Sequence, residues 1–153
     1  MSYNEKFMRK AMDLAQKAYQ EDEVPVGAVI VLDGKVIASA YNKRESSFDA
    51  TAHAEILAIK KACKKLKDFR LIGAEMYVTL EPCVMCTGAI LNARIENVYF
   101  GAYISNGSIS AEELSSRAEL NHKTNFYGGF LEQENSKIVS DYFKSKRKNN
   151  KNN

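Results

Sequence analysis

The chain has 153 residues, of which 45% are hydrophobic, and a formal net charge of +3. This length and composition fit one domain with a substantial core and argue against two. Its first ten residues are polar and charged, no stretch approaches the length of a membrane span, and three cysteines without an apolar leader indicate a reducing compartment. These features argue against a membrane or secreted protein, so we expect a cytoplasmic one.

The positive charge is concentrated at the C-terminal end. Five basic residues follow Asp141 without an acidic residue among them: Lys144, Lys146, Arg147, Lys148 and Lys151. Because these five exceed the net charge of the whole chain, the rest of the chain is net acidic. We expect one folded domain over 1–147 and a basic, disordered tail over 148–153. Such a tail can bind phosphates, or it is simply a solvated end rich in Lys and Asn.

The first predicted elements are a helix and a hairpin. A surface helix from about Tyr3 to Gln20 is predicted by apolar residues at i, i+4, i+7, i+8 and i+11, namely Phe7, Ala11, Leu14, Ala15 and Ala18. An apolar, β-branched run then covers Ala28 to Leu32, Asp33-Gly34 is a turn signal, and Lys35 to Ala40 returns. This pattern predicts a β-hairpin.

The middle of the chain alternates between helices and strands. Asn42 to Ala50 is polar and lacks periodicity, which predicts a loop. A helix is predicted from about Ala52 to Lys65, capped by Thr51 or Asp49, with Ile56, Ile59, Ala62 and Cys63 or Leu66 facing inward. A strand, a helix and a strand follow, at Glu75 to Leu80, about Val84 to Ala93, and Asn97 to Gly101.

The last third has weaker patterns. Ser105 to Ser110 is loop-like, a short helix fits around Ala111 to Ala118, and Asn125 to Gly128 fits a last strand. A final helix ending near Lys146 is outlined by Leu131, Ile138, Val139, Tyr142 and Phe143. The order strand, helix, strand, helix, strand predicts an α/β fold in which parallel strands are joined by crossovers and ligands bind at the turns after the strands.

Two short strings, His53-Ala54-Glu55 and Pro82 to Cys86, contain the candidate chemistry. One imidazole and two thiols provide three zinc ligands, and a catalytic zinc site needs three protein ligands with a fourth position open for water. Cys83 and Cys86 are placed at i and i+3 after a proline, so both face one way from a helix start, where thiol pKa values are lowered. Glu55, two residues after His53, is placed to take a proton from water without binding the metal. We therefore expect one zinc ion per chain on His53, Cys83 and Cys86, with Glu55 as the catalytic residue.

Other interpretations of these residues remain. A Cys-x-x-Cys pair also fits a structural zinc knuckle or a redox pair, but a structural zinc site needs a fourth ligand, and the unused Cys63 and His122 lack ligand spacing. Cys63, in the Lys-rich run from Lys60 to Lys67, is interpreted as an ordinary buried or half-buried thiol. His122 is either a hydrogen-bonded loop residue or a phosphate ligand.

The spacing H-x-E…P-C-x-x-C is a known signature of zinc-dependent nucleobase deaminases. From about Phe7 to Arg147 the sequence resembles the bacterial tRNA adenosine deaminases of the cytidine-deaminase superfamily. The resemblance rests on five strings: Glu23 to Ala28, Thr51 to Glu55, Tyr77 to Cys86, Asn121-His122 and Ser140 to Phe143. The zinc strings identify only the superfamily, whereas the residues around Glu81 and Asp141 indicate the tRNA branch. The resemblance implies a three-layer α/β/α sandwich with a mixed five-stranded sheet, and a homodimer.

The resemblance also implies an activity, the zinc-dependent hydrolytic deamination of adenosine to inosine at the wobble position of a tRNA anticodon. The implied partner is a tRNA anticodon loop. The implied substrate-binding residues are Val26, Asn42, Ala54, Tyr142, Phe143, Lys146 and Arg147.

The sequence departs from the family in the loop after Ala102. The family usually has an Asp and a Lys there that contact nucleic acid, and this chain has Ile104 and Asn106. The metal and proton-transfer residues are intact, but the substrate stays open, since sugar and phosphate contacts position it. One alternative is a deaminase of a free nucleobase or nucleoside (guanine, cytosine or adenosine) on the same zinc site. A second is a non-catalytic RNA-binding partner, against which the presence of Glu55 argues.

Overall fold

The structure, a computed structural model, is described over residues 3–104, 109–117 and 122–151. Its helices are α1 (Glu5–Gln20), α2 (Arg44–Ser47), α3 (Ala54–Leu66), α4 (Val84–Asn92), α5 (Ala111–Arg117) and α6 (Glu132–Lys151). Its strands are β1 (Gly27–Leu32), β2 (Lys35–Tyr41), β3 (Glu75–Leu80), β4 (Asn97–Ala102) and β5 (Asn125–Tyr127). Within the described ranges, no helix combines the length and the apolar character needed to cross a membrane.

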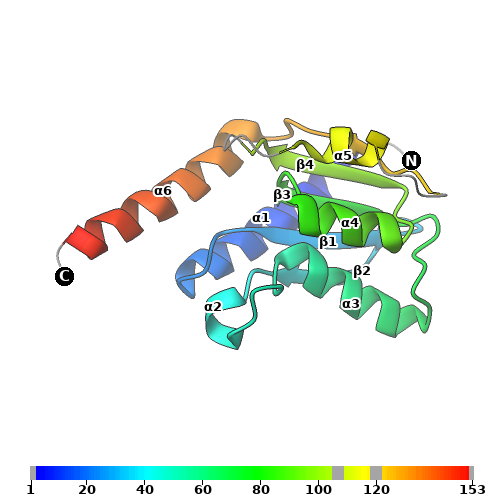
Figure 1. The fold of residues 1–153 in the computed structure, drawn as a ribbon, viewed down its shortest axis with the longest axis horizontal. Helices are drawn as coiled ribbons and strands as arrows, with labels where there is room; N and C mark the ends of the chain where they lie inside the picture. The colour runs from blue at the N-terminus through cyan, green and yellow to red at the C-terminus, as the bar shows by residue number, and fades with distance from the viewer. Residues whose placement is uncertain (1–2, 105–108, 118–121, 152–153) are drawn as a thin grey trace.

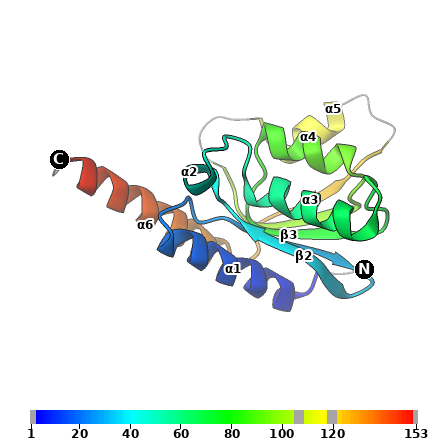
Figure 2. The ribbon, with the colours of Figure 1, turned by 90° about the horizontal axis from the view of Figure 1, so that it is seen from below.

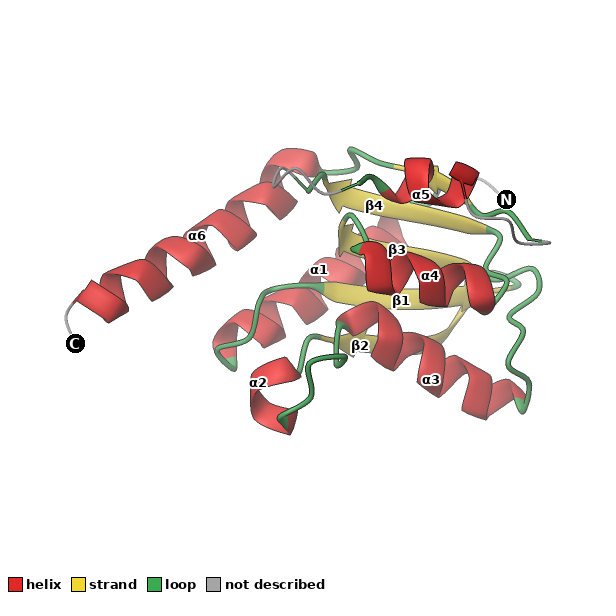
Figure 3. Cartoon of the chain, viewed as in Figure 1, coloured by secondary structure: helices red, strands yellow, loops and turns green. Residues whose placement is uncertain are grey.

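The strands form one mixed sheet in the order β2-β1-β3-β4-β5 (Figures 1 and 3). β1 is antiparallel to both β2 and β3, whereas β3, β4 and β5 are parallel. Figure 2 shows α1 on one side of the sheet and α3 and α4 on the other. The predicted three-layer α/β/α sandwich with a mixed five-stranded sheet is therefore confirmed.

The central strands supply side chains to two cores, one on each face of the sheet. In β1, Ala28 and Ile30 face the helices α3 and α4, whereas Val29 and Val31 face α1. β3 and β4 alternate in the same way, because successive side chains of a strand point to opposite faces. Strands covered on both sides are apolar at almost every position, which is why β1 and β4 appear in the sequence as continuous hydrophobic runs.

The hairpin and the first helix lie close together. Asp33 and Gly34 have φ values of 51° and 76°, the positive values that a tight two-residue hairpin turn requires. At the other end of β1, a Cβ on Gly27 would lie 2.0 Å from the backbone oxygen of Ala11. Only glycine allows α1 to approach the sheet this closely. The contact fixes the start of β1 against α1.

The start of α3 differs from the prediction. His53 is the N-cap residue, and neither Thr51 nor Asp49 caps the helix. The Asp49 carboxylate instead accepts hydrogen bonds from the backbone N and the hydroxyl of Thr51, at 2.8 and 2.7 Å, which closes a local turn. The buried face of α3 was also predicted wrongly in part. It consists of Ala54, Glu55, Ala58 and Ala62, because small side chains let the helix lie close to the sheet.

Two further predictions were wrong. The polar segment from Asn42 to Ala50 contains the single helical turn α2, which is too short to show periodicity. α6 runs to Lys151 and does not end near Lys146, since Arg147, Lys148 and Lys151 are good helix formers and no glycine or proline stops the helix before its end. Most of the predicted loop Ser105 to Ser110, with Asn106, lies outside the described residues, and the division into a domain and a tail stays a prediction.

Candidate metal centre

The two predicted metal-binding strings meet at one edge of the sheet. His53 immediately precedes α3, which follows β2, and Cys83 immediately precedes α4, which follows β3. β2 and β3 run in the same direction because both are antiparallel to β1. Both helices therefore begin at the edge where these strands end, the place where open α/β sheets bind ligands.

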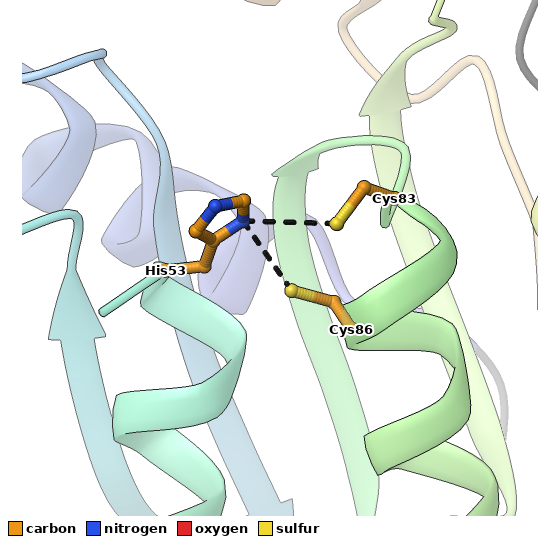
Figure 4. A group of neighbouring side chains, drawn as sticks. All are labelled: His53, Cys83 and Cys86. Carbon is orange, nitrogen blue, oxygen red and sulfur yellow. Dashed lines mark hydrogen bonds between the residues drawn. The ribbon is translucent and has the colours of Figure 1, made fainter. Parts of the chain in front are cut away.

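Three side chains converge at this edge (Figure 4). His53 Nδ1 lies 3.7 Å from Cys83 Sγ and 3.5 Å from Cys86 Sγ. In a tetrahedral site with Zn–N bonds of about 2.0 Å and Zn–S bonds of about 2.3 Å, the nitrogen and a sulfur are about 3.5 Å apart. Among the described residues, these three form the one group of histidine, cysteine or acidic side chains that converges as a metal site would require. The geometry therefore fits a zinc ion with three protein ligands and one open position.

The two thiols influence each other's ionisation. A hydrogen bond with Cys86, together with the nearby His53, lowers the pKa of the Cys83 thiol to about 3. The same hydrogen bond with Cys83, followed by burial and the charge of Glu55, raises the pKa of the Cys86 thiol. The two sulfurs thus share one negative charge, and both become thiolates only when a positive ion compensates their repulsion.

Glu55 lies beside this group without belonging to it. It is in the first turn of α3, 3% exposed, and burial raises the pKa of its carboxyl group to about 7. A carboxyl group with a pKa near neutrality can both accept and donate a proton at physiological pH. This place, two residues after His53 and outside the group of three converging side chains, is compatible with the predicted role of Glu55, which stays a prediction.

The predicted pocket residues are joined to one another by hydrogen bonds. The side-chain oxygen of Asn42, which is buried, accepts a hydrogen bond from the backbone N–H of Ala54 at 2.8 Å. The backbone N–H of Asn42 donates to the carbonyl oxygen of Val26 at 3.2 Å. Ala54 lies between His53 and Glu55, so this chain of bonds connects Asn42 and Val26 to the segment that carries the metal-site residues. Their role in substrate binding stays a prediction.

The four predicted contacts on α6 fall into two groups. Tyr142 is buried and its hydroxyl donates to the backbone oxygen of Asp22 at 3.2 Å, while Lys146 Nζ lies 2.7 Å from the Asp22 carboxylate. Phe143 and Arg147 are exposed. Tyr142 and Lys146 therefore attach α6 to the end of α1, and Phe143 and Arg147 are the two that face solvent.

Two buried carboxylates near the site had no predicted role. Glu23 accepts hydrogen bonds from the backbone N–H groups of Glu45 and Ser46, and Glu81 accepts them from Ile104 and Ala111. Each carboxylate fixes a segment that flanks the metal centre. The hydrogen-bond partners of both carboxylates are backbone groups more than twenty residues away, so no residue pattern could have indicated these hydrogen bonds.

The remaining candidates have structural contacts. His122 Nε2 lies 2.8 Å from the carbonyl oxygen of Ile95, which agrees with its interpretation as a hydrogen-bonded loop residue. Cys63 is half-buried, with its sulfur 3.6 Å from the carbonyl oxygen of Phe69, as expected for an ordinary thiol.

Several known proteins are similar to this chain in sequence and in fold. The family model of the cytidine and deoxycytidylate deaminase zinc-binding region matches residues 1–102. A tRNA-specific adenosine deaminase of Bacillus subtilis (strain 168) is 43% identical over 153 residues, which are 99% of this chain and 95% of that protein. A solved structure from a study of A-to-I editing by tRNA:A34 deaminases superposes with a TM-score of 0.84 and 44% identity, over 88% of this chain and 99% of the other. A guanine deaminase from Bacillus subtilis superposes with a TM-score of 0.65 and 35% identity, over 91% and 93% of the two chains.

Proposed function

The chain belongs to the tRNA-specific adenosine deaminases, within the cytidine and deoxycytidylate deaminase family, and from this membership we propose that it deaminates adenosine to inosine at the wobble position of a tRNA anticodon. The observation that carries the deamination chemistry is the three-ligand metal centre with the buried Glu55 beside it, and the tRNA substrate is supported by the 43% identity to a tRNA-specific adenosine deaminase. A site with three ligands and an open position suits catalysis, whereas a structural zinc site would be closed by a fourth ligand.

We propose that His53, Cys83 and Cys86 hold one zinc ion per chain. When bound, zinc lowers the pKa of water and so supplies a nucleophile at neutral pH. Both cysteines lie at the start of α4, where the positive end of the helix favours thiolates. His53 binds through Nδ1, because this is the nitrogen that faces the two sulfurs, while Nε2 faces the guanidinium of Arg44 at 3.5 Å.

Glu55 carries the protons of the reaction. Its carboxylate takes a proton from the attacking water and gives it to N1 of adenine, while oxygen adds to C6. The hydroxyl group now on C6 gives its proton through the same carboxylate to the amino group, the C–N bond breaks as the C6 carbonyl forms, and the amino group leaves as ammonia. Water and adenosine thus give inosine and ammonia, and the pKa of about 7 suits Glu55 to both directions of transfer.

We propose that the substrate contacts come from two sides. Asn42, with Val26 and Ala54, lines the pocket for the target nucleoside next to Glu55. Phe143 and Arg147 on α6 contact the anticodon loop, supported by their exposure. Because Tyr142 and Lys146 are already bonded to Asp22, their part is to hold α6 in place. An adenosine in a single-stranded loop reaches a buried site at lower cost than one in a duplex.

We also propose that the protein is a cytoplasmic homodimer. Support for the dimer comes from α4, which contains no charged residue although it lies in the outer layer of the sandwich. Val84 and Met85 in its first turn are 51% and 37% exposed. An uncharged helix face of this kind is typical of a surface that a second chain covers.

The deciding experiment offers the protein several substrates. Purified protein with zinc is incubated with an anticodon stem-loop, with whole tRNA, and with free bases and nucleosides. We expect inosine at the wobble position, which sequencing records as a change from A to G. Since a guanine deaminase is 35% identical to this chain, ammonia released only from free bases or nucleosides would contradict the proposal. A chain that binds the stem-loop but is inactive alone would support the non-catalytic alternative.

A further inference from the structure

Phe48 is an aromatic side chain that the fold does not use. It directly follows α2 and is 96% exposed, more than any other large hydrophobic side chain of the described residues. Its backbone has a φ of 52°, in the left-handed region that a phenylalanine seldom adopts. Neither packing within the chain nor backbone preference explains why a phenylalanine stands here.

The segment that carries Phe48 is held firmly in place. The Glu23 carboxylate, which is 1% exposed, accepts hydrogen bonds from the backbone N–H groups of Glu45 at 3.0 Å and Ser46 at 2.8 Å. The backbone N–H of Lys43 donates to the carbonyl oxygen of Ala52 at 3.0 Å. The ring of Phe48 therefore extends from an ordered support, so a ligand that contacts it does not have to order a mobile loop first.

The same segment forms the rim of the metal centre. Arg44, the first residue of α2, has Nη1 3.5 Å from His53 Nε2. Asn42, two residues earlier, bonds to Ala54 between the metal ligand and Glu55. Figures 1 and 2 both show α2 at the end of the molecule where α3 and α4 begin. One short segment thus carries both a cation next to a metal-site residue and, four residues later, an exposed aromatic ring.

We propose that the segment Lys43–Phe48 is a stacking platform for the RNA: an unpaired nucleobase next to the reacting adenosine stacks on Phe48, and the guanidinium of Arg44 contacts the adjoining phosphate. This inference rests on the proposed function and names the second contact of the same substrate. When one base of a single-stranded loop enters a pocket, its neighbours become unstacked, and aromatic side chains with basic residues beside them are the usual acceptors for such bases. A free nucleobase would gain nothing from a platform outside the pocket.

Substitution of Phe48 tests the contact by kinetics with an anticodon stem-loop. We expect Phe48→Ala to raise KM roughly tenfold, since stacking on an aromatic ring contributes binding that is the same in the ground and transition states, and to leave kcat within about twofold. Phe48→Trp should keep the wild-type KM and Phe48→Leu should not, because the contact needs a flat ring. Phe69, which is 64% exposed and follows the far end of α3, gives the matched control, and Phe69→Ala should change neither constant.

Fluorescence tests the stacking without any turnover. Two stem-loops carry 2-aminopurine in place of the nucleotide on the 5′ or the 3′ side of the wobble adenosine. Stacking should quench one of the two probes when wild-type protein binds, and Phe48→Ala should remove that quench. If the wild-type and Phe48→Ala proteins quench each probe to the same extent, the platform is overturned, even when the protein makes inosine. A protein that makes no inosine but shows the Phe48-dependent quench would overturn the proposed reaction and leave the platform supported.

Glu23 tests the need for a fixed support. Glu23→Gln replaces one acceptor oxygen by an NH₂ group that faces a backbone N–H, so α2 should loosen and KM for the stem-loop should rise several-fold. Glu75 is the matched control, since its carboxylate is also buried and accepts hydrogen bonds from Asn97 and Tyr99, but at the opposite end of β3. Glu75→Gln should lower the Tm without changing KM. Equal KM values for Glu23→Gln and Glu75→Gln would overturn the role of Glu23.

A different outcome would reject the platform itself. If Phe48→Ala changes the oligomeric mass of the protein but not its KM, Phe48 belongs to a protein interface.

Discussion

Glu55 combines deep burial with a position next to the metal ligands but outside the ligand group. Glu55→Ala removes the proton carrier and leaves the three ligands unchanged. We expect the rate of inosine formation to fall by at least about 10²-fold, the usual contribution of a positioned acid–base group, while the zinc content stays near one per chain. Measuring both rate and metal content on one preparation separates chemistry from binding. A variant that makes inosine at a near wild-type rate would remove Glu55 from the mechanism.

Cys86 and Cys63 are two half-buried or buried thiols with different surroundings. Cys86→Ser replaces a soft sulfur ligand by a hydroxyl that zinc binds poorly, so we expect zinc content and activity to be lost together. The chain should also unfold at a lower temperature, because metal binding to the native state stabilises it. Cys63→Ser is the control, and its zinc content and activity should equal those of the wild type. Metal analysis after dialysis against a chelator checks both, and a zinc-loaded Cys86→Ser protein would contradict the ligand assignment.

A single site residue can be predicted from the sequence when its type and its spacing to nearby residues already indicate its chemistry. His53, Glu55, Cys83 and Cys86 could be predicted because their types and spacings alone specify metal and proton chemistry. Glu23 could not, because it acts on backbone N–H groups 22 and 23 residues away, and any sequence offers such groups. Carboxylates that support a loop therefore appear only once the chain is folded.

Helix α6 has two neighbouring cations in different electrostatic settings. Lys146 is paired with the Asp22 carboxylate, whereas the exposed Arg147 has no ion pair among the described residues. If α6 contacts RNA phosphates, Arg147→Met should reduce the slope of log K against log salt by about 0.7, the value for one phosphate contact on a single strand. Lys146→Met should change that slope less, since its charge is already compensated. Stem-loop binding measured at several salt concentrations tests this, and equal slope changes for the two variants would contradict it.

Element boundaries were predicted best where a local signal marks them. The hairpin was indicated by Asp33-Gly34 and is present. The short helix near Ala111 is present too, although its sequence pattern was weak. The start of α3 was misplaced because two plausible capping residues precede it and the structure uses neither. α2 was missed because a single helical turn is defined by its anchor, the carboxylate of Glu23, and not by periodicity.

At the scale of the whole molecule, the layered sandwich follows from strands that are apolar on both faces. Such strands require helices on each side, so the alternation of strands and helices in the sequence was sufficient to predict an α/β fold, whereas the mixed five-stranded sheet was implied only by the family resemblance. The proposed assembly of two chains has a weaker signal in the sequence. This signal is the absence of charge on one face of an outer helix. α4 could be identified as an outer helix only from its position in the fold.

Gly88 allows the proposed dimer to be tested on that face. A Cβ at Gly88 would have no neighbouring atom within 4 Å, so a long side chain there fits a single chain, and replacing glycine favours the helix itself. Gly88→Arg should nevertheless prevent a second chain from covering α4, because a charge would be buried without a partner. We expect light scattering after size-exclusion chromatography to show twice the mass of one chain for the wild type and the mass of one chain for Gly88→Arg. Ile72→Arg, at a residue that is 67% exposed and lies outside the helices, is the control and should stay dimeric. A Gly88→Arg protein that keeps the double mass would show that the chains associate through another face.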